Sequence, residues 1–329
     1  MRPEPVRLAE LVATLSLVSD LGMGRPMERV LRQTVIAMRL ADAADVGPEV
    51  SAATYYTSLL TWVGCATDTS ELAELFGDET HLYADSHDED MAGLTMAVFV
   101  AKHLGYGSSR FRRLGMVGKF VVTAGRSVQQ QMESHCQSAS ELADRLELGE
   151  SVCVPLVQAF ERWDGKGVPG RVGTSELAPA IRLVQLADAP EAFEHTGGID
   201  AAIEVATARR GTQFDPALVD CFCERPEEIL HGLGTFNAWD QVIDLDPRLG
   251  ERLTPAQLDS ALEALGDFAD LKSPFRLGLS RGVADLAGDA AALVVMDEDE
   301  IANLRRAASI HDVGMVGVPS GVWDATEPW

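Results

Sequence analysis

The chain has 329 residues, of which 46% are apolar and 24% are charged, a balance typical of soluble globular proteins. Its 51 acidic side chains outnumber 27 basic ones and give a formal net charge of -24. A charge of this sign repels phosphate backbones, so we expect no direct binding of nucleic acid. The length allows one large domain or two moderate ones.

The start of the chain predicts an amphipathic helix rather than a targeting segment. Acidic residues occur early, and apolar residues recur at the helical spacing of Leu8, Leu11, Val12, Leu15 and Val18. No apolar run approaches the roughly 20 residues that span a bilayer. The five cysteines are odd in number and scattered, which is typical of reduced thiols. We therefore predict a cytoplasmic protein that does not enter a membrane.

Helix signals recur along the chain, and no stretch shows the sustained alternation of a strand. Three helix starts carry a residue that can accept a bond from an unpaired amide, namely Asp215, Thr254 and Asp297. Proline follows the first two, at a helical position where its missing amide costs nothing. Turn signals cluster in residues 245–255. The sequence predicts an all-α protein with a domain boundary near residue 250.

The chain also contains an internal repeat. Residues 58–65 (SLLTWVGC) and 308–315 (ASIHDVGM) share a helical apolar run, two variable residues and then Val-Gly. Upstream, residues 26–30 can be aligned with residues 279–283, which leaves gaps of 35 and 32 residues to the later motifs. The matching order and spacing predict two related units.

The variable pair is Thr61-Trp62 in the first unit and His311-Asp312 in the second. Imidazole and carboxylate groups that leave one helix end can both reach a divalent metal, and the metal can activate water for attack on a phosphoryl group. The apolar residues on its helical face indicate that the His311 side chain points toward the core. The alternative is a structural histidine that closes the end of its helix.

Four segments carry a resemblance to a known family: residues 310–324 (IHDVGMVGVPSGVWD), 160–170 (FERWDGKGVPG), 181–193 (IRLVQLADAPEAF) and 211–222 (GTQFDPALVDCF). In order and spacing they resemble the HD-GYP phosphohydrolases, which hydrolyse cyclic di-GMP with a cluster of two or three metals. The resemblance implies an HD-domain-like helical bundle over residues 1–240, with an insertion at about 66–130. It implies the N-terminal part of a second such unit over residues 250–329. This arrangement of two HD-GYP-like units with degenerate motifs is similar to that of regulators in which such domains precede a LuxR-type helix-turn-helix.

The resemblance assigns metal-ligand positions in the first unit, and most have lost their ligands. These positions fall on Pro26, Thr61, Trp62, Ala159 and Phe160, whereas His135 and Asp188 remain as vestigial ligands. Two ligands should not hold a hard divalent ion. We therefore expect no cofactor in this unit and assign no catalytic residue to it; an active protein would use iron or manganese.

Other family positions point to structure rather than catalysis. In the segment 160–170, called the second motif below, six residues are interpreted as a scaffold that fixes a loop: Glu161, Trp163, Asp164, Gly165, Gly167 and Pro169. The second unit keeps His311 and Asp312 as candidate metal ligands, but Leu279 stands at its earlier histidine position. Because the sequence stops at Trp329, the second unit is interpreted as a truncated product or a fragment.

Three functions fit these observations. The leading hypothesis is a non-catalytic sensory or interaction domain in bacterial signal transduction, which binds a small ligand or a protein partner. The alternative is a metal-dependent cyclic-dinucleotide phosphodiesterase that uses His311 and Asp312. Another subunit or the acidic residues 77–91 would then supply the missing ligands. The third is half of a transcription regulator whose DNA-binding part lies elsewhere.

The incomplete second unit predicts a contact surface. Its expected helices carry two apolar stripes: Leu258, Leu262, Leu265 and Phe268 on one, and Ile301, Leu304 and Ala308 on the other. A half-domain cannot easily offset its ordering entropy alone, so the stripes should be covered. They can dock on the first unit or pair with a second chain, and we favour the homodimer.

Overall fold

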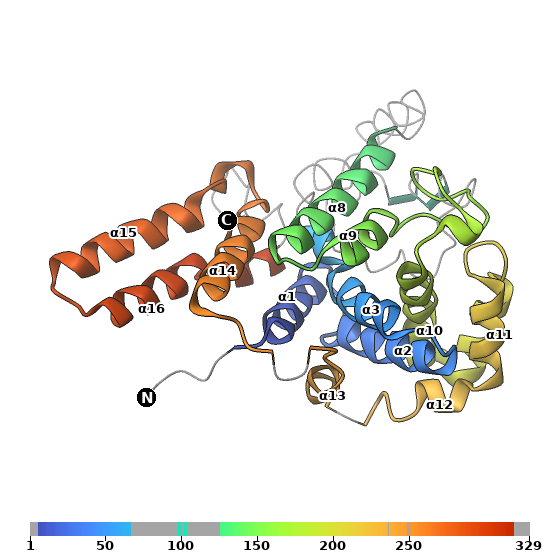
Figure 1. The fold of residues 1–329 in the computed structure, drawn as a ribbon. Coiled ribbons are helices and arrows are strands. Elements are labelled where there is room, and N and C mark those ends of the chain that lie inside the picture. The colour runs from blue at the N-terminus through green and yellow to red at the C-terminus, as the bar shows by residue number, and fades with distance from the viewer. Residues whose placement is uncertain are drawn as a thin grey trace.

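The computed structural model describes residues 6–66, 98–99, 102–103, 126–235, 237–248 and 251–318, apart from the side chains of 66, 126–128 and 194–196. Within these residues the chain is helical and contains no strand, which confirms the predicted all-α class (Figure 1). Most of the insertion expected at 66–130 lies outside them, and so does the acidic segment 77–91.

The helices (α) and 3-10 helices (η) have the following bounds in chain order: α1 (Leu8–Gly22), α2 (Arg29–Ala43), α3 (Pro48–Leu60), η1 (Val63–Ala66), α8 (Arg126–Arg145), α9 (Glu150–Val157), η2 (Thr174–Glu176), α10 (Pro179–Ala208), α11 (Pro216–Glu224), α12 (Pro226–Leu230), α13 (Ala238–Asp244), α14 (Pro255–Asp270), η3 (Pro274–Arg276), α15 (Leu279–Leu293), α16 (Glu298–Ser309) and η4 (Val313–Gly317). Of the described helices, none is long and apolar enough to cross a membrane.

The three predicted helix starts are confirmed. The Asp215 carboxylate accepts a hydrogen bond from the amide of Ala217 at 2.9 Å. Thr254 and Asp297 each form a reciprocal capping box, in which the residue three positions later returns a side-chain contact. Each interaction satisfies amides that the first helical turn leaves unpaired.

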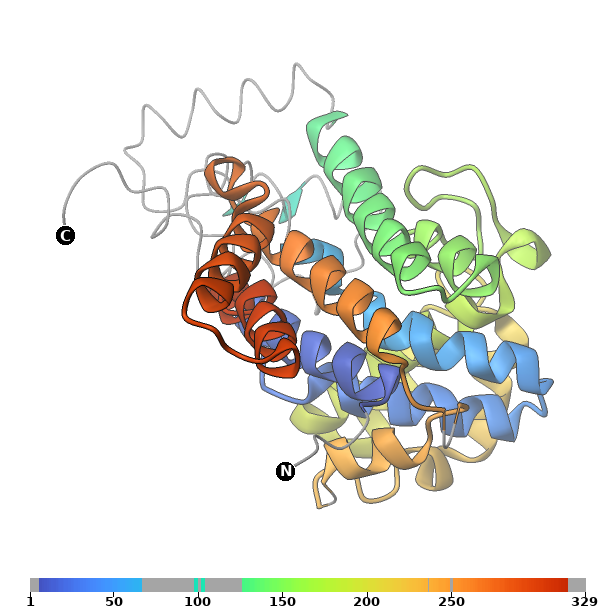
Figure 2. The ribbon, with the colours of Figure 1, turned by 60° about the vertical axis from the view of Figure 1, so that its left-hand side comes forward.

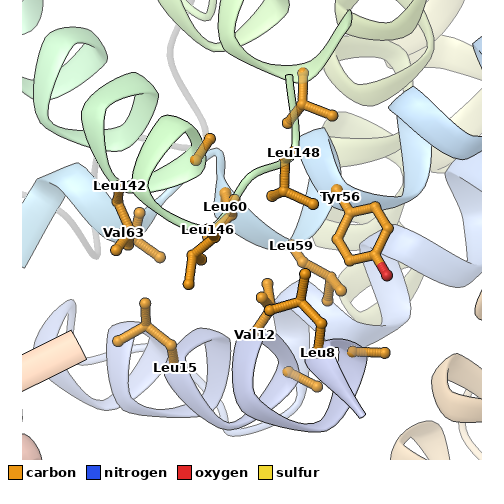
Figure 3. Packing of buried hydrophobic residues seen from close by; sticks show 14 of the residues in the cluster. Leu8, Val12, Leu15, Tyr56, Leu59, Leu60, Val63, Leu142, Leu146 and Leu148 are labelled. Carbon is orange, nitrogen blue, oxygen red and sulfur yellow. The ribbon is translucent and has the colours of Figure 1, made fainter. Parts of the chain in front are cut away.

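Two apolar cores organise the first unit. In one, α1 packs against α3 and α8 (Figure 3), through the labelled residues Leu8, Val12, Leu15, Leu59, Leu60, Leu142 and Leu146. In the other, α2 packs against α10, α11 and α12, and Ile36 and Phe214 are buried in it. Helix α2 is therefore covered on more than one face and forms the centre of the unit.

The internal repeat is visible as matching structure. The Asp20 carboxylate at the end of α1 accepts the amide of Val30 at 3.3 Å, and the Asp270 carboxylate at the end of α14 accepts the amide of Ser280 at 2.9 Å. The two pairs lie 250 residues apart in the sequence (270 minus 20, and 280 minus 30). Helices α1, α2 and α3 with η1 thus correspond to α14, α15 and α16 with η4.

The structure corrects the predicted alignment of the upstream segments. Glu28 (φ 68°) and Gly278 (φ 79°) both precede a helix in the left-handed conformation, which fixes where α2 and α15 begin. Leu279 therefore corresponds to Arg29, three residues after the predicted Pro26. Both gaps to the later motif are then 32 residues (61 minus 29, and 311 minus 279). If Leu279 marks the earlier histidine position, the first unit has arginine there.

The second unit docks on the first through α14 and η4. Leu262, Leu265 and Phe268 of α14 are buried in the same core as α1 and α8, so the first unit covers this predicted stripe. Val316 of η4 is fully buried against α1, where a Cβ atom on Gly22 would lie 2.9 Å from the Val316 carbonyl oxygen. The α15–α16 hairpin extends away from the first unit (Figure 1 and Figure 2).

Candidate degenerate metal site and histidine-aspartate pair

Several ligand positions implied by the family resemblance come together in the first unit, but as aromatic rings. The ring centroids of Trp62 and His135 lie 6.4 Å apart, those of Trp62 and Phe160 also 6.4 Å, and those of His135 and Phe160 4.9 Å. Trp62 follows α3, His135 belongs to α8 and Phe160 follows α9. Edge-on and tilted contacts at these distances are favourable packing, and they fill the space between the three elements.

His135 is committed to a structural hydrogen bond. Its Nε2 lies 2.8 Å from the carbonyl oxygen of Thr61, so Nε2 carries the proton and donates it. Burial lowers the pKa of His135 to about 4. The imidazole is therefore neutral at physiological pH, and Nε2, which bonds the Thr61 carbonyl oxygen, is not available as a metal ligand.

A guanidinium group stands beside the other vestigial ligand. Arg29 Nη2 lies 2.5 Å from Asp188 Oδ1, and Arg29 Nε lies 3.2 Å from a Glu191 carboxylate oxygen. Arg32 reaches the second Glu191 oxygen at 3.0 Å. The Arg29 side chain is only 4% exposed. A buried arginine thus supplies the positive charge that a metal would otherwise bring to Asp188.

Two arginines also lie over the indole that replaces the aspartate. The guanidinium carbon of Arg25 is 4.8 Å from the Trp62 ring centroid, and that of Arg29 is 5.7 Å away. Cation–π contacts of this kind gain strength when they are desolvated. Burial and the neighbouring Arg29 lower the pKa of Arg25 to about 9, so its guanidinium remains largely protonated at neutral pH.

These residues do not fit a metal ion. Trp62 and Phe160 offer no ligand atom, and Asp188 already bonds Arg29. Among the described residues, no three His, Cys, Asp or Glu side chains gather as a metal site would require. The first unit therefore has no described set of groups that could carry metal-dependent hydrolysis.

Asp20 adds an ionisable group close to this cluster. Burial raises the pKa of Asp20 to about 7, although Arg29 and the Val30 amide act in the opposite direction. One oxygen accepts the Val30 amide, while Oδ1 has no hydrogen-bond partner in the described part of the chain. A buried carboxylate with one oxygen unsatisfied is costly when it is charged.

The stability of the first unit should consequently fall as pH rises from about 4 to 7, because the folded state holds a proton that the unfolded chain has lost. At 1.36 kcal/mol per pKa unit, Asp20 accounts for at most about 4 kcal/mol of this fall. The Asp20→Asn variant should lose that slope in urea unfolding at pH 5 and pH 8. The equivalent Asp270→Asn should instead destabilise at both pH values, since both Asp270 oxygens accept bonds from Ser280. Equal slopes in wild type and Asp20→Asn would contradict the prediction.

The loop expected to be a scaffold is closed by its own side chains. The buried Glu161 carboxylate accepts the amides of Gly170 and Arg171 at 3.1 and 2.8 Å. A Cβ atom on Gly167 would lie 2.5 Å from the Glu161 Cα, so glycine is needed for this close approach. Gly165 has a φ of 71°, which also favours glycine, and Pro169 follows a cis peptide bond.

The same loop is anchored to the segment before α11. The Trp163 amide donates to the Gln213 carbonyl at 3.1 Å, and the Asp164 amide donates to the Thr212 carbonyl at 2.8 Å. The Arg182 guanidinium carbon lies 5.5 Å from the Trp163 ring centroid. This geometry supports the interpretation of the second motif as a scaffold.

The second unit presents its histidine and aspartate together at the end of α16. His311 Nε2 and Asp312 Oδ2 lie 3.1 Å apart, and the two side chains are 34% and 25% exposed. The expectation that the imidazole points toward the core is wrong, because His311 Nδ1 turns back and donates to the Ala308 carbonyl at 2.7 Å. Arg276 Nη2 pairs with the same Asp312 oxygen, Oδ2, that faces His311.

The spacing of these two atoms has a chemical meaning. Two ligands that bind one metal at about 2.1 Å and at right angles lie about 3 Å apart. With Nδ1 donating to Ala308, Nε2 is the His311 nitrogen that faces Asp312. A divalent metal at this pair would have to displace Arg276 from the Asp312 oxygen, as a metal would have to displace Arg29 from Asp188, and it would need further ligands.

A cavity of about 280 Å³ lies elsewhere, where the linker to α14 crosses the first unit. Its lining includes Tyr56, Arg145, Arg248 and Gln257. None of the site residues predicted from the sequence lines it.

The described residues form an all-α chain with one cluster of aromatic rings at the family's ligand positions and one histidine-aspartate pair. No family model matches the chain. Over 325 residues it is 27% identical to the 3'3'-cGAMP-specific phosphodiesterase 3 of Vibrio cholerae, a match that covers 96% of this chain and 70% of the relative.

A solved structure shows the same fold. The crystal structure of the cyclic GMP-AMP specific phosphodiesterase V-cGAP3 of V. cholerae superposes with a TM-score of 0.72 at 24% identity, over 98% of this chain and 74% of that one. The comparisons support the resemblance to the HD-GYP phosphodiesterases. They do not test the expected similarity to regulators with a LuxR-type helix-turn-helix. They favour the phosphodiesterase hypothesis over the leading, non-catalytic one.

Proposed function

We propose that this chain is a cyclic-dinucleotide phosphodiesterase of the HD-GYP type, in which the first unit is metal-free and His311 and Asp312 belong to the catalytic metal centre. The observation that carries the proposal is the 3.1 Å approach of His311 Nε2 to Asp312 Oδ2 in a chain that matches a phosphodiesterase over 96% of its length. The proposed substrates are 3'3'-linked cyclic dinucleotides.

The residues of the second unit would each have a defined task. A bound divalent ion, iron or manganese, would supply an activated water and polarise the phosphoryl group. His311 and Asp312 would hold this ion, with Ala308 fixing the imidazole through its carbonyl. The ion would displace Arg276 from the Asp312 oxygen that faces His311. The remaining ligands would come from residues outside the described ranges or from another chain.

The test is hydrolysis of 3'3'-cGAMP and cyclic di-GMP by the full chain, followed by chromatography of the products with manganese or iron present. His311→Ala and Asp312→Ala should each reduce turnover at least about 100-fold, since loss of a ligand disrupts the metal site. The exposed His231→Ala and Asp244→Ala serve as matched controls and should retain activity. Turnover that survives both substitutions at the pair would contradict the proposal.

A second candidate is a non-catalytic sensory unit, which the buried Arg29–Asp188 ion pair favours. Metal analysis of the purified chain, before and after loading with manganese, distinguishes the two functions. A folded chain that takes up no metal and shows no turnover would support the second candidate. Stoichiometric metal that is lost in His311→Ala would support the first.

A further inference from the structure

The cavity beneath the linker to α14 brings together groups of different chemistry. Its volume of about 280 Å³ is near the lower end for pockets that hold small molecules. Residues of α1, α3, the end of α8, the linker after α13 and the first turns of α14 line it. These elements belong to the first unit or to the helix that docks on it. The exposed α15–α16 hairpin contributes nothing to the lining.

Asp246 gives the cavity a buried hydrogen-bond acceptor. The residue is only 2% exposed and lines the cavity. Its Oδ1 accepts the Tyr56 hydroxyl at 3.2 Å and the Arg248 amide at 2.9 Å, whereas Oδ2 accepts no hydrogen bond from the described residues. A carboxylate can only accept, and a buried one needs donors around it. The contents of the cavity should therefore present N–H or O–H groups to Asp246.

The rim of the cavity is rich in guanidinium groups. Arg145, Arg248 and Arg252 line it, in a chain where acidic side chains outnumber basic ones by 51 to 27. Exposed Glu147 and Glu251 line the same rim and offset part of this charge. Guanidinium groups stay charged and bond planar or tetrahedral oxyanions with paired N–H groups. The rim therefore favours one anionic group, such as a phosphate.

The start of α14 adds a backbone donor at this rim. In its first turn the Thr254 amide bonds Gln257 and the Gln257 amide bonds Thr254, while Pro255 has no N–H. The Ala256 amide remains, and Ala256 lines the cavity. Unpaired amides and the dipole of a first helical turn both stabilise a bound anion. The arginines and the helix start thus favour the same kind of group.

The base of the cavity suits a planar ring. The Arg248 guanidinium carbon lies 5.5 Å from the Tyr56 ring centroid, and both residues contact Asp246. Nucleic-acid bases stack on aromatic rings and on guanidinium planes. Of the four common bases, guanine offers two neighbouring N–H donors, N1 and N2, to a carboxylate. The matching edges of the other bases combine donors with acceptors, which Asp246 would repel.

We propose that this cavity binds a guanine nucleoside monophosphate, at a site separate from His311 and Asp312. The guanine edge bonds Asp246 and its face lies against Arg248, while the phosphate lies at the rim near Arg145 and the Ala256 amide. The volume takes one nucleotide rather than a cyclic dinucleotide. A nucleotide bound there contacts the first unit and α14 at the same time. The proposal does not depend on hydrolytic activity.

The first experiment measures binding to the full chain by calorimetry in the presence of EDTA, which removes any contribution of a metal at the histidine-aspartate pair. The probes are GMP, AMP, guanosine and inorganic phosphate. GMP should bind at least about 10-fold more tightly than each of the others, because only it satisfies both ends of the cavity. No binding of GMP at millimolar concentration, or equal affinities for GMP and AMP, would show that water alone fills the cavity or that Asp246 does not read the base.

The second experiment reverses the base preference. Asp246→Asn keeps the Oδ1 acceptor for Tyr56 and Arg248 but replaces Oδ2 by an N–H donor. The variant should bind GMP at least about 10-fold more weakly and should prefer xanthosine monophosphate, whose C2 carbonyl replaces the guanine amino group. Asp244→Asn, at an exposed position two residues earlier, should keep the wild-type preference. A purely structural role of Asp246 cannot produce the reversal, so its absence overturns the proposal.

The third experiment tests the phosphate end. Arg145→Met should weaken GMP binding at least about 10-fold and leave guanosine binding unchanged. Arg281→Met is the matched control, because Arg145 and Arg281 both pair with Asp267, at 2.8 and 2.5 Å, and only Arg145 lines the cavity. An equal loss of GMP and guanosine binding in Arg145→Met would contradict the placement of the phosphate.

Discussion

Replacement of Arg29 by methionine is expected to lower the free energy of unfolding by about 3–5 kcal/mol. Methionine keeps much of the side-chain volume but removes the charge that Asp188 and Glu191 share. The Glu191 side chain is only 2% exposed, so its carboxylate would lose a bonded cation in a site that water does not reach. Urea unfolding followed by circular dichroism measures the loss.

Arg210→Met is the control for this prediction. Arg210 forms a similar two-bond contact with Asp220, at 2.7 and 2.6 Å, but on the surface. Exposed ion pairs are screened by water and salt, so this substitution should leave stability nearly unchanged. Equal losses in the two variants would show that burial of Arg29 is not what makes its ion pair important.

Restoring the ligands of the first unit is expected to unfold it rather than to recover a metal centre. The variant carries Arg29→His, Thr61→His, Trp62→Asp, Ala159→His and Phe160→His. Removing a buried aromatic ring costs up to about 3–5 kcal/mol, and here the partly buried Trp62 ring is removed and the partly buried Phe160 ring is exchanged for a polar imidazole. Trp62 Nε1 also donates to the buried Gln33 at 2.9 Å, a bond that aspartate would not reproduce. The summed cost approaches the whole stability of a typical domain.

Thermal unfolding with and without manganese, together with metal analysis, measures the outcome. We expect a large loss of the cooperative transition in the fivefold variant and no bound metal at the first unit. Ala159→His alone is the control, because Ala159 is only partly buried and the aromatic rings remain. A stable fivefold variant that binds metal in a chain also carrying His311→Ala would contradict the prediction.

The sequence was most informative where the physics is local. Asp215, Thr254 and Asp297 predicted helix starts because capping depends on residues two or three positions apart, and all three are confirmed. The repeat was also visible, since Thr61-Trp62 and His311-Asp312 follow matching apolar runs. Its upstream register was not visible, because few identities remain there.

Long-range contacts were the part that the sequence did not contain. Arg29 bonds Asp188, 159 residues away, and nothing in either segment signals the other. The left-handed turn at Glu28, which places Arg29 rather than Pro26 at the helix start, is also a rare conformation for glutamate. The burial of the α14 stripe, including Phe268, depends on how α14 packs against α1 and α8. Three-dimensional packing therefore decides that Arg29 supplies the positive charge beside Asp188.

The close contact between Gly22 and Val316 makes the two units thermodynamically reciprocal. Val316 belongs to the short helix that follows His311 and Asp312, and Gly22 ends the helix that carries Asp20. With a tight backbone approach at this point, the segment after the pair cannot shift without moving the end of α1. If binding at His311 and Asp312 changes an equilibrium constant of the first unit by some factor, a shift of that equilibrium changes the binding constant at the pair by the same factor. A unit whose candidate ligand positions hold aromatic rings can in this way affect what binds at His311 and Asp312 in the other.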